Sequence, residues 1–565
     1  MKTNRGQSFR RRRVGRFGII ALVALAVAFA ALLPPRAQDT PIPSWTITAP
    51  TIRGAYHIHS NRSDGAGTLD DIAEAASRAG LQFVIVTDHG DGTRPPEPPS
   101  YRYGVLCLDG VELSTNDGHY VALGLSAAPY QLAGTAESVI EDVTRFGGFG
   151  IVAHADSARP SLQWRAWDQP FDALEWLSID TEWRDEPWSA LARAAVTYWA
   201  RGPAALSSLL DRPRALIARW DNVINTRRAP VLAAADAHAR LGIRQRSDPD
   251  TDGWYLPMPR YESSFRVFSN HVVLDRPFGR DPVDDGARLL AAIRQGRVFT
   301  VLDGLATPGA FEFVATSRDR TSSIGEVLPL QGHAIVRARV AAPAGASMVL
   351  LRDGSVVQQT TDSELSAEVT TPGAYRIEVS LPGHSSIPWL FSNPIYVGFD
   401  QPAPASEPAP GIAPIPVALG QAGGETSAGS STELDGNAEI VWRYRLASGT
   451  PAGQYAAVRV PVSGLSEATR VRFDVNADRP MRVWVQLRRP GGVGERWGRT
   501  VYVDETKRSI DLEIERLAPI GVTTTARAAM AVVDSLLFVV DTVNTRSGSS
   551  GTVRFSNVGF ARSAR

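Results

Sequence analysis

The stretch GAYHIHSNRSDG, residues 54–65, decides how we interpret the fold of this chain. His57 and His59 stand one residue apart in a chain with only nine histidines, and Asp64 follows five residues after His59. In a β-strand the two imidazoles would share one face, about 6.5–7 Å apart along the strand. At that distance both can reach one metal ion, although an isolated pair with this spacing is more often structural.

Further apolar, strand-like runs end at their C-terminal side in His, Asp or Glu. These residues are Asp88 and His89 after FVIVT, Glu112 after GVLCLDG, His154 after GFGIVA, and Asp236 and His238 after APVLAAA. His119 in DGHYVALG begins such a run instead. Because parallel α/β barrels build their active sites from the C-terminal ends of strands, we expect these side chains to form one site. The other three histidines, at positions 271, 333 and 384, are interpreted as structural.

Residues 51–312 alternate strand-like and helix-like segments. Leu69–Arg78 has apolar residues at helical spacing before Gly80, and Asp284–Gly296 reads as a second amphipathic helix. QFVIVT, residues 82–87, is apolar on both faces, which is typical of a parallel strand covered on both sides. The alternation predicts βαβ units and a parallel sheet in an α/β domain.

The rest of the chain reads as all-β. Residues 313–400 predict a small β-sandwich, 401–436 a Pro-, Gly- and Ser-rich linker, and 437–565 a jelly-roll-like module. The last module resembles carbohydrate-binding jelly rolls, so a glycan or a cell surface is a candidate partner. Its residues Trp442, Trp484 and Trp497 either stack on sugars or form the core.

Composition limits the function. The 59 basic and 59 acidic residues balance, and all but two of the basic residues are arginine, so no nucleic-acid partner is expected. The single cysteine, Cys107, excludes an internal disulfide framework and a cysteine-rich zinc site. Any metal must therefore be held by His, Asp and Glu.

Residues 1–38 predict export. Arg10–Arg13 and Arg16 precede an apolar run, Phe17–Leu33, which is long for a signal peptide and just long enough to span a bilayer. The segment is either cleaved, around residues 35–38, or kept as an anchor. Both alternatives place the body outside the cytoplasm, as a periplasmic, secreted or membrane-anchored protein whose membrane contact is limited to this segment.

Taken together, HIHS-x3-DG, TDHG, GVE, GH, AHAD and DAH resemble the PHP (polymerase and histidinol phosphatase) family over residues 51–312. The resemblance implies a distorted (β/α)7 barrel, followed here by the two all-β modules, and two or three divalent ions (Zn, Mn or Fe) at the barrel mouth. It implies a first metal on His57, His59, Glu112 and Asp236, a second on Glu112, His119 and His154, and a third on Asp64, His89 and His238.

The implied activity is hydrolysis by a hydroxide that bridges two metals, and a phosphoester is the favoured small-molecule substrate. A carboxylic ester, carbamate or amide is the alternative, because the domain order also resembles the exported carbaryl-hydrolase-like branch. An inactive barrel in a glycan- or surface-binding protein is the second alternative. The catalytic candidates are Asp236, His238 and Asp88. Asp88 is either a proton acceptor, a group that orients a ligand, or a carboxylate of the turn. The substrate-binding candidates are Arg62 and Arg240.

Overall fold

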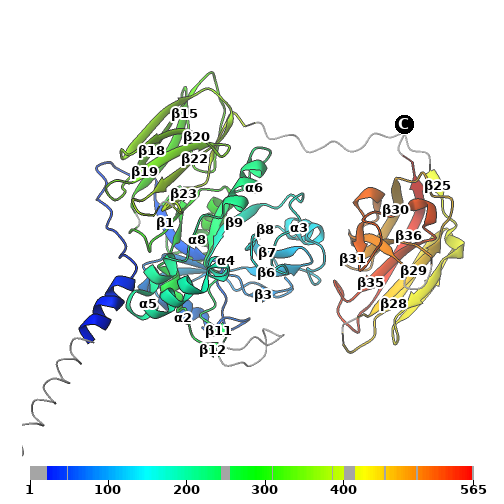
Figure 1. The fold of residues 1–565 in the computed structure, drawn as a ribbon. Helices are drawn as coiled ribbons and strands as arrows, with labels where there is room; N and C mark the ends of the chain where they lie inside the picture. Colours follow the sequence, from blue (N-terminus) through cyan, green and yellow to red (C-terminus); the bar gives the residue numbers. More distant parts are fainter. Residues whose placement is uncertain are drawn as a thin grey trace, which may run out of the picture.

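The computed structural model describes residues 22–47, 49–242, 255–307, 309–384, 386–399, 414–450, 453–490 and 494–562 (Figure 1). Most of the predicted export segment, residues 1–21, lies outside these ranges, and residues 22–32 are helical. Within the described ranges, no helix combines the length and the apolar character needed to cross a membrane.

Two mixed sheets form the first part of the molecule. One contains, in spatial order, β14 (Val298–Val301), β13 (Ser269–Val273), β1 (Thr51–Tyr56), β2 (Phe83–Val86), β5 (Val105–Asp109) and β4 (Ser100–Arg102). The other contains β10 (Val231–Ala234), β9 (Ala173–Ser178), β8 (Phe149–Val152), β7 (Gly118–Leu123), β6 (Val111–Thr115) and β3 (His89–Gly90). Apolar side chains of both sheets, among them Ile85, Leu108, Val121 and Ile151, share one buried core.

The predicted (β/α)7 barrel with parallel strands is wrong. In the described part of the chain these strands form two separate sheets with no closed ladder, and an isolated bridge between Ile58 and Ala237 lies just beyond the ends of β1 and β10. Among the described strands between residues 51 and 301, parallel pairing is limited to β1–β2–β5, β8–β9–β10 and β3–β6. The hairpin that joins β6 to β7 has no crossover helix, so this pair is necessarily antiparallel.

Helices cover the sheets and connect their strands. They are α2 (Leu69–Arg78), α3 (Ala136–Arg145), α4 (Ile179–Asp185), α5 (Trp188–Ser207), α6 (Arg214–Ile224), α7 (Tyr261–Phe265) and α8 (Pro282–Arg294). The predicted helix over 69–78 is confirmed, with Thr68 and Asp71 forming a capping box. The second predicted helix begins two residues early, because Asp281 caps its first turn. A two-stranded ribbon, β11 (Leu241–Gly242) and β12 (Tyr255–Leu256), lies beside them.

The middle β-region is fused to the first sheet rather than separated at residue 312. β23 (Leu390–Ser392) pairs with β14, so one 12-stranded sheet runs through both regions. Its other members are β17 (Val327–Leu328), β19 (Ser347–Arg352), β20 (Ser355–Thr360), β22 (Gly373–Ser380) and β24 (Ile395–Val397). A four-stranded sheet of β16 (Arg320–Ser323), β15 (Phe311–Ser317), β18 (Ala334–Val340) and β21 (Glu364–Val369) completes the region.

The C-terminal part is a β-sandwich of two six-stranded sheets around one apolar core. The first sheet contains β25 (Pro414–Pro416), β27 (Ser431–Asp435), β28 (Glu439–Arg445), β36 (Ser550–Ala561), β30 (Arg470–Ala477) and β33 (Arg508–Glu513). The second contains β26 (Gly423–Thr426), β29 (Tyr455–Pro461), β35 (Ser535–Asp541), β31 (Met481–Arg488), β32 (Arg496–Val503) and β34 (Ala518–Ile520).

Two expectations for this part change. Strands β25, β26 and β27 fall inside the predicted linker, residues 401–436, so the linker is shorter than expected. The three tryptophans expected to face sugars or the core, Trp442, Trp484 and Trp497, are all buried. Their indole rings therefore do not offer an exposed stacking platform.

Candidate metal centre

Three of the predicted ligands lie just beyond the ends of strands, where the backbone is strained. His57 directly follows β1, and His154 and Asp236 lie two residues beyond β8 and β10. All three have positive φ, 62°, 29° and 41°. Positive φ is rare for residues other than glycine and is concentrated at functional sites. The strand predicted over His57 and His59 ends at Tyr56, before both histidines, and the turn that follows brings their two Nε2 atoms to 3.1 Å.

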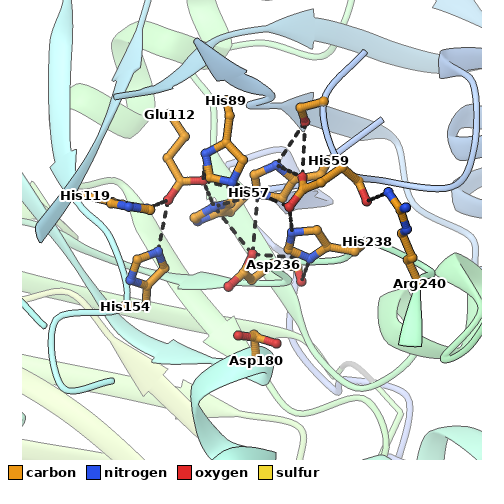
Figure 2. Close-up of polar contacts among 12 residues, drawn as sticks. His57, His59, His89, Glu112, His119, His154, Asp180, Asp236, His238 and Arg240 are labelled. Atoms are coloured by element: carbon orange, nitrogen blue, oxygen red, sulfur yellow. Dashed lines mark hydrogen bonds and ion pairs between the residues drawn. The ribbon is translucent and has the colours of Figure 1, made fainter. Parts of the chain in front are cut away.

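Four ligand atoms converge at the spacing of a metal coordination shell. His57 Nε2 lies 3.2 Å from Glu112 Oε2 and 3.6 Å from Asp236 Oδ1. His59 Nε2 lies 3.2 Å and 3.4 Å from the same two oxygens (Figure 2). A tetrahedral ion with bonds of about 2.05 Å separates its ligands by about 3.3 Å. These four residues are the set implied for the first metal.

The other two implied ligand sets are also brought together. Glu112 turns its second oxygen, Oε1, toward His119 Nδ1 at 2.7 Å and His154 Nε2 at 2.9 Å, which are hydrogen-bond distances. Asp64 Oδ2 lies 3.2 Å from His238 Nε2 and 3.6 Å from His89 Nε2. In-register pairing of His89 with Glu112 aligns β3 and β6, so all nine predicted ligands occupy one continuous cluster (Figure 2).

Glu175, in the middle of β9, is a site residue that sequence reasoning missed. Its Oε1 lies 2.6 Å from His57 Nδ1, and its Oε2 accepts a hydrogen bond of 2.7 Å from the backbone N–H of His154. The carboxylate is buried. A buried glutamate inside the apolar run ALEWLS was the signal available in the sequence.

The arrangement requires a positive charge at its centre. Because the Glu175 carboxylate accepts a hydrogen bond from His57 Nδ1, a neutral His57 ring would turn its Nε2 lone pair toward two carboxylates. Burial alone would lower the pKa of His57, but the charges of Glu175, Asp236 and Glu112 raise it well above its usual value. In the metal-free chain, protons on the histidines supply this positive charge, and divalent cations fit the same set of N and O donors.

The carboxylates and histidines of the cluster perturb one another in opposite directions. Burial would raise the pKa of Glu112, but His57, His119 and His154 lower it well below its usual range. Burial would lower the pKa of His154, but Glu112 raises it to about 9. The carboxylates are therefore ionised at neutral pH, as metal ligands must be.

Two predicted residues brace the loop after His59. Asp88 accepts hydrogen bonds from Ser60 N and Ser63 Oγ, both 2.7 Å, and from Arg62 Nε at 2.9 Å. The Arg62 guanidinium also binds the carboxylates of Glu97 and Asp109 at 2.8 Å. These contacts place Arg62 and Asp88 in the support of the loop, and the substrate-binding role of Arg62 and the catalytic role of Asp88 stay predictions.

The rim of the cluster carries two more polar groups. Arg240 Nη1 lies 3.5 Å from the carbonyl oxygen of Asp64, and its guanidinium stacks 4.8 Å from the ring centre of Tyr255. Asp180, in the first turn of α4, lies below Asp236 (Figure 2). Both oxygens of Asp180 bind Arg184, at 2.6 and 2.7 Å. Arg240 thus stays a substrate-binding candidate, and the Asp180 carboxylate is paired with Arg184 of the same helix.

Comparisons with family models, curated proteins and solved structures gave the following findings. No family model matches it, and no curated protein matches it. Among solved structures it is similar to a family 11 carbohydrate-binding module of the cellulosomal cellulase Lic26A-Cel5E of Clostridium thermocellum, with 14% identity over 28% of this chain and 98% of the module and a TM-score of 0.23. A family 30 module of the cellulase Cel9D-Cel44B of the same organism gives 14% identity, 27% and 97% coverage and a TM-score of 0.20.

Proposed function

We propose that this chain is a metal-dependent hydrolase with its site at the nine-residue cluster, and that phosphoesters are its substrate class. The observation that carries the proposal is the convergence of His57, His59, Glu112 and Asp236 at the ligand spacing of an ion. The likeness of the motifs to the PHP family supports the same reading. Glu175 supports it further, because metal-ligating histidines usually donate their second N–H to a carboxylate.

The protein residues have defined tasks in this proposal. Two or three divalent ions (Zn, Mn or Fe), when bound, would supply the Lewis acidity that activates a water molecule and stabilises charge on the substrate. Glu112 lies between two ligand groups and would hold an ion with each carboxylate oxygen. Asp236 and His238 face the same space and are candidates to hold or pass a proton there. No serine or cysteine nucleophile is required.

An arginine at the rim favours a phosphoester over another ester. Arg240 lies beside Asp64, with its Nη1 atom 3.5 Å from the carbonyl oxygen of Asp64. Guanidinium groups bind phosphate oxygens through paired, charge-assisted hydrogen bonds. A carboxylic ester, carbamate or amide is the alternative substrate, since the same metal chemistry would cleave it.

The test measures hydrolysis and metal content on the same sample of the full chain. Substrates are p-nitrophenyl phosphate, bis-p-nitrophenyl phosphate, p-nitrophenyl acetate and a naphthyl carbamate. The variant His57→Ala removes a ligand, and His333→Ala, an exposed histidine outside the cluster, is the matched control. We expect bound metal and phosphate release in wild type and His333→Ala, and the loss of both in His57→Ala.

Cleavage of the carboxylic ester or carbamate alone would favour the alternative substrate. A chain that binds no divalent metal at neutral pH would refute the proposal.

A further inference from the structure

The outward face of α5 is apolar over its first helical segment. Trp188 is 85% exposed, Val196 54% and Trp199 72%, and the intervening Ala192 and Ala195 are also exposed. These positions follow the spacing i, i+4, i+7, i+8 and i+11, so they form one stripe along the helix. A helix on a water-facing surface normally carries polar residues on its outer face, whereas the outer face of α5 offers two tryptophans.

The N-terminal helix leaves the body of the protein beside this stripe (Figure 1). Arg193 Nε donates to the carbonyl oxygen of Leu32 at 2.9 Å, and Arg201 donates to the carbonyl oxygen of Pro34. The two arginines on α5 therefore hold the end of the helix formed by residues 22–32. That helix is itself apolar and exposed, with Leu22, Leu25 and Val27 each more than 60% exposed.

The segment after this helix belongs to the folded body. Pro34 is buried, and the backbone N–H of Gln38 donates to Leu305 O at 2.9 Å. Thr307 N donates in return to Gln38 O at 2.8 Å. Cleavage around residues 35–38 would cut through this docked segment, so these contacts favour retention of the N-terminal helix.

We propose that the apolar face of α5 lies in the interfacial layer of a lipid bilayer, beside an N-terminal helix that is kept as an anchor. Tryptophan is enriched at the membrane–water interface, and an apolar helix face can lie there parallel to the membrane plane. The stripe is about 17 Å long at 1.5 Å per residue. In this proposal the protein contacts the membrane at α5 as well as through the N-terminal segment. This membrane contact does not depend on the reaction proposed above.

The test places a fluorescent label on the stripe of the full chain. Cys107 is buried, so Val196→Cys provides a selective site for an environment-sensitive NBD label. Val522→Cys is the matched control, because Val522 is 98% exposed in the C-terminal sandwich. Both proteins are reconstituted with phosphatidylcholine–phosphatidylglycerol vesicles whose acyl chains are brominated near the headgroup. We expect a blue shift and loss of emission at position 196 and no change at position 522.

A second variant distinguishes membrane contact of the α5 stripe from attachment through the N-terminal helix. Trp188→Ser combined with Trp199→Ser is expected to stay vesicle-bound through the N-terminal helix but to lose the quenching at position 196. Equal responses at 196 and 522 in the vesicle-bound wild type overturn the proposal. A blue shift that appears without vesicles and grows with protein concentration overturns it in favour of a second copy of the chain. If N-terminal sequencing shows that the mature protein begins beyond residue 34, the proposed anchor is overturned.

Discussion

The buried carboxylate of Glu175 contacts one residue in each of two predicted ligand groups, His57 and His154. It accepts hydrogen bonds from His57 Nδ1 and from the backbone N–H of His154. Glu175→Gln keeps the shape but replaces one acceptor oxygen with a donor, so His57 loses its fixed tautomer. We expect metal affinity to fall by about 10–100-fold, as for other partners of metal-ligating histidines.

Competition with a chromogenic chelator measures this affinity. The control is Glu182→Gln, which makes the same change at a buried glutamate that accepts from the backbone of Asp211. Equal affinities of the two variants would show that Glu175 does not support the ligands.

His271 gives a pH-dependent prediction outside the cluster. It is buried in β13, stacked 4.8 Å from the ring of Phe299, and burial together with the charge of Arg53 lowers its pKa to about 3. The unfolded chain binds a proton near pH 6.5 that the folded chain cannot bind. This site therefore reduces the free energy of unfolding as pH falls from about 6.5 toward 3, by at most about 1.4 kcal/mol per pH unit.

His271→Gln removes this contribution. Unfolding midpoints at pH 7 and pH 5 are compared for wild type and variant. Asp303, whose buried carboxyl has a pKa raised to about 7 and which faces the same region, titrates in both proteins and cancels in the difference. The stability advantage of wild type over the variant should shrink at pH 5, and an unchanged advantage would contradict the depressed pKa.

At the scale of elements, the turn between β1 and α2 determines where Asp64 stands. Asp88 receives three hydrogen bonds from Ser60 and Ser63, and a Cβ atom on Gly65 would lie 2.1 Å from the carbonyl oxygen of His59. The turn is therefore tight and depends on one carboxylate. Asp88→Asn leaves Ser60 or Ser63 without an acceptor and weakens the contact with Arg62.

We expect Asp88→Asn to bind one metal ion fewer per chain than wild type, because only the Asp64 ligand group depends directly on this turn. Elemental analysis after dialysis measures the stoichiometry. Asp70→Asn, at a largely exposed carboxylate on α2, is the control. Loss of all metal from Asp88→Asn would instead mean that the turn supports the whole cluster.

The elements that the sequence predicted are those governed by local pattern. Residues 83–86 are a buried parallel strand and residues 69–78 a capped helix, as their apolar spacing and caps indicate. Sheet pairing depends on contacts far apart in the chain, so the antiparallel neighbours of β1 and β7 left no local signal. Eight of the nine predicted ligands stand near a strand end, and Asp64 was included through its motif and the family resemblance, whereas Glu175 inside a strand resembles an ordinary core position.

At the scale of the whole molecule, the C-terminal sandwich packs against α3 and the loops around the cluster. Asn544 Nδ2 donates to the carbonyl oxygens of Gln131 and Ala133, at 2.9 and 3.0 Å. Arg546 donates to Thr93 Oγ1 at 3.1 Å, four residues after His89. The sandwich thus supports a segment that directly follows a predicted metal ligand. The rest of the same chain covers one face of one of its sheets.

Arg482 is the centre of this interface. The side chain is buried, and it binds both oxygens of Asp142 on α3 at 2.6 and 2.8 Å as well as the carbonyl oxygen of Ser138 at 3.0 Å. Arg482→Met leaves the Asp142 carboxylate buried without its cation, which costs about 3–5 kcal/mol for a buried pair. We expect a lower thermal midpoint and, in limited proteolysis, release of the C-terminal sandwich from the rest of the chain.

The control and the rescue distinguish a lost charge pair from general damage. Arg472→Met removes an arginine from an exposed pair on the other sheet and should leave both measurements unchanged, because exposed pairs contribute at most about 1 kcal/mol. Asp142→Asn combined with Arg482→Met removes the buried charge while the new amide can still accept from Tyr130 Oη, so this double variant should be more stable than Arg482→Met alone. If the double variant is no more stable than the single one, packing of the arginine side chain rather than its charge holds the sandwich against α3.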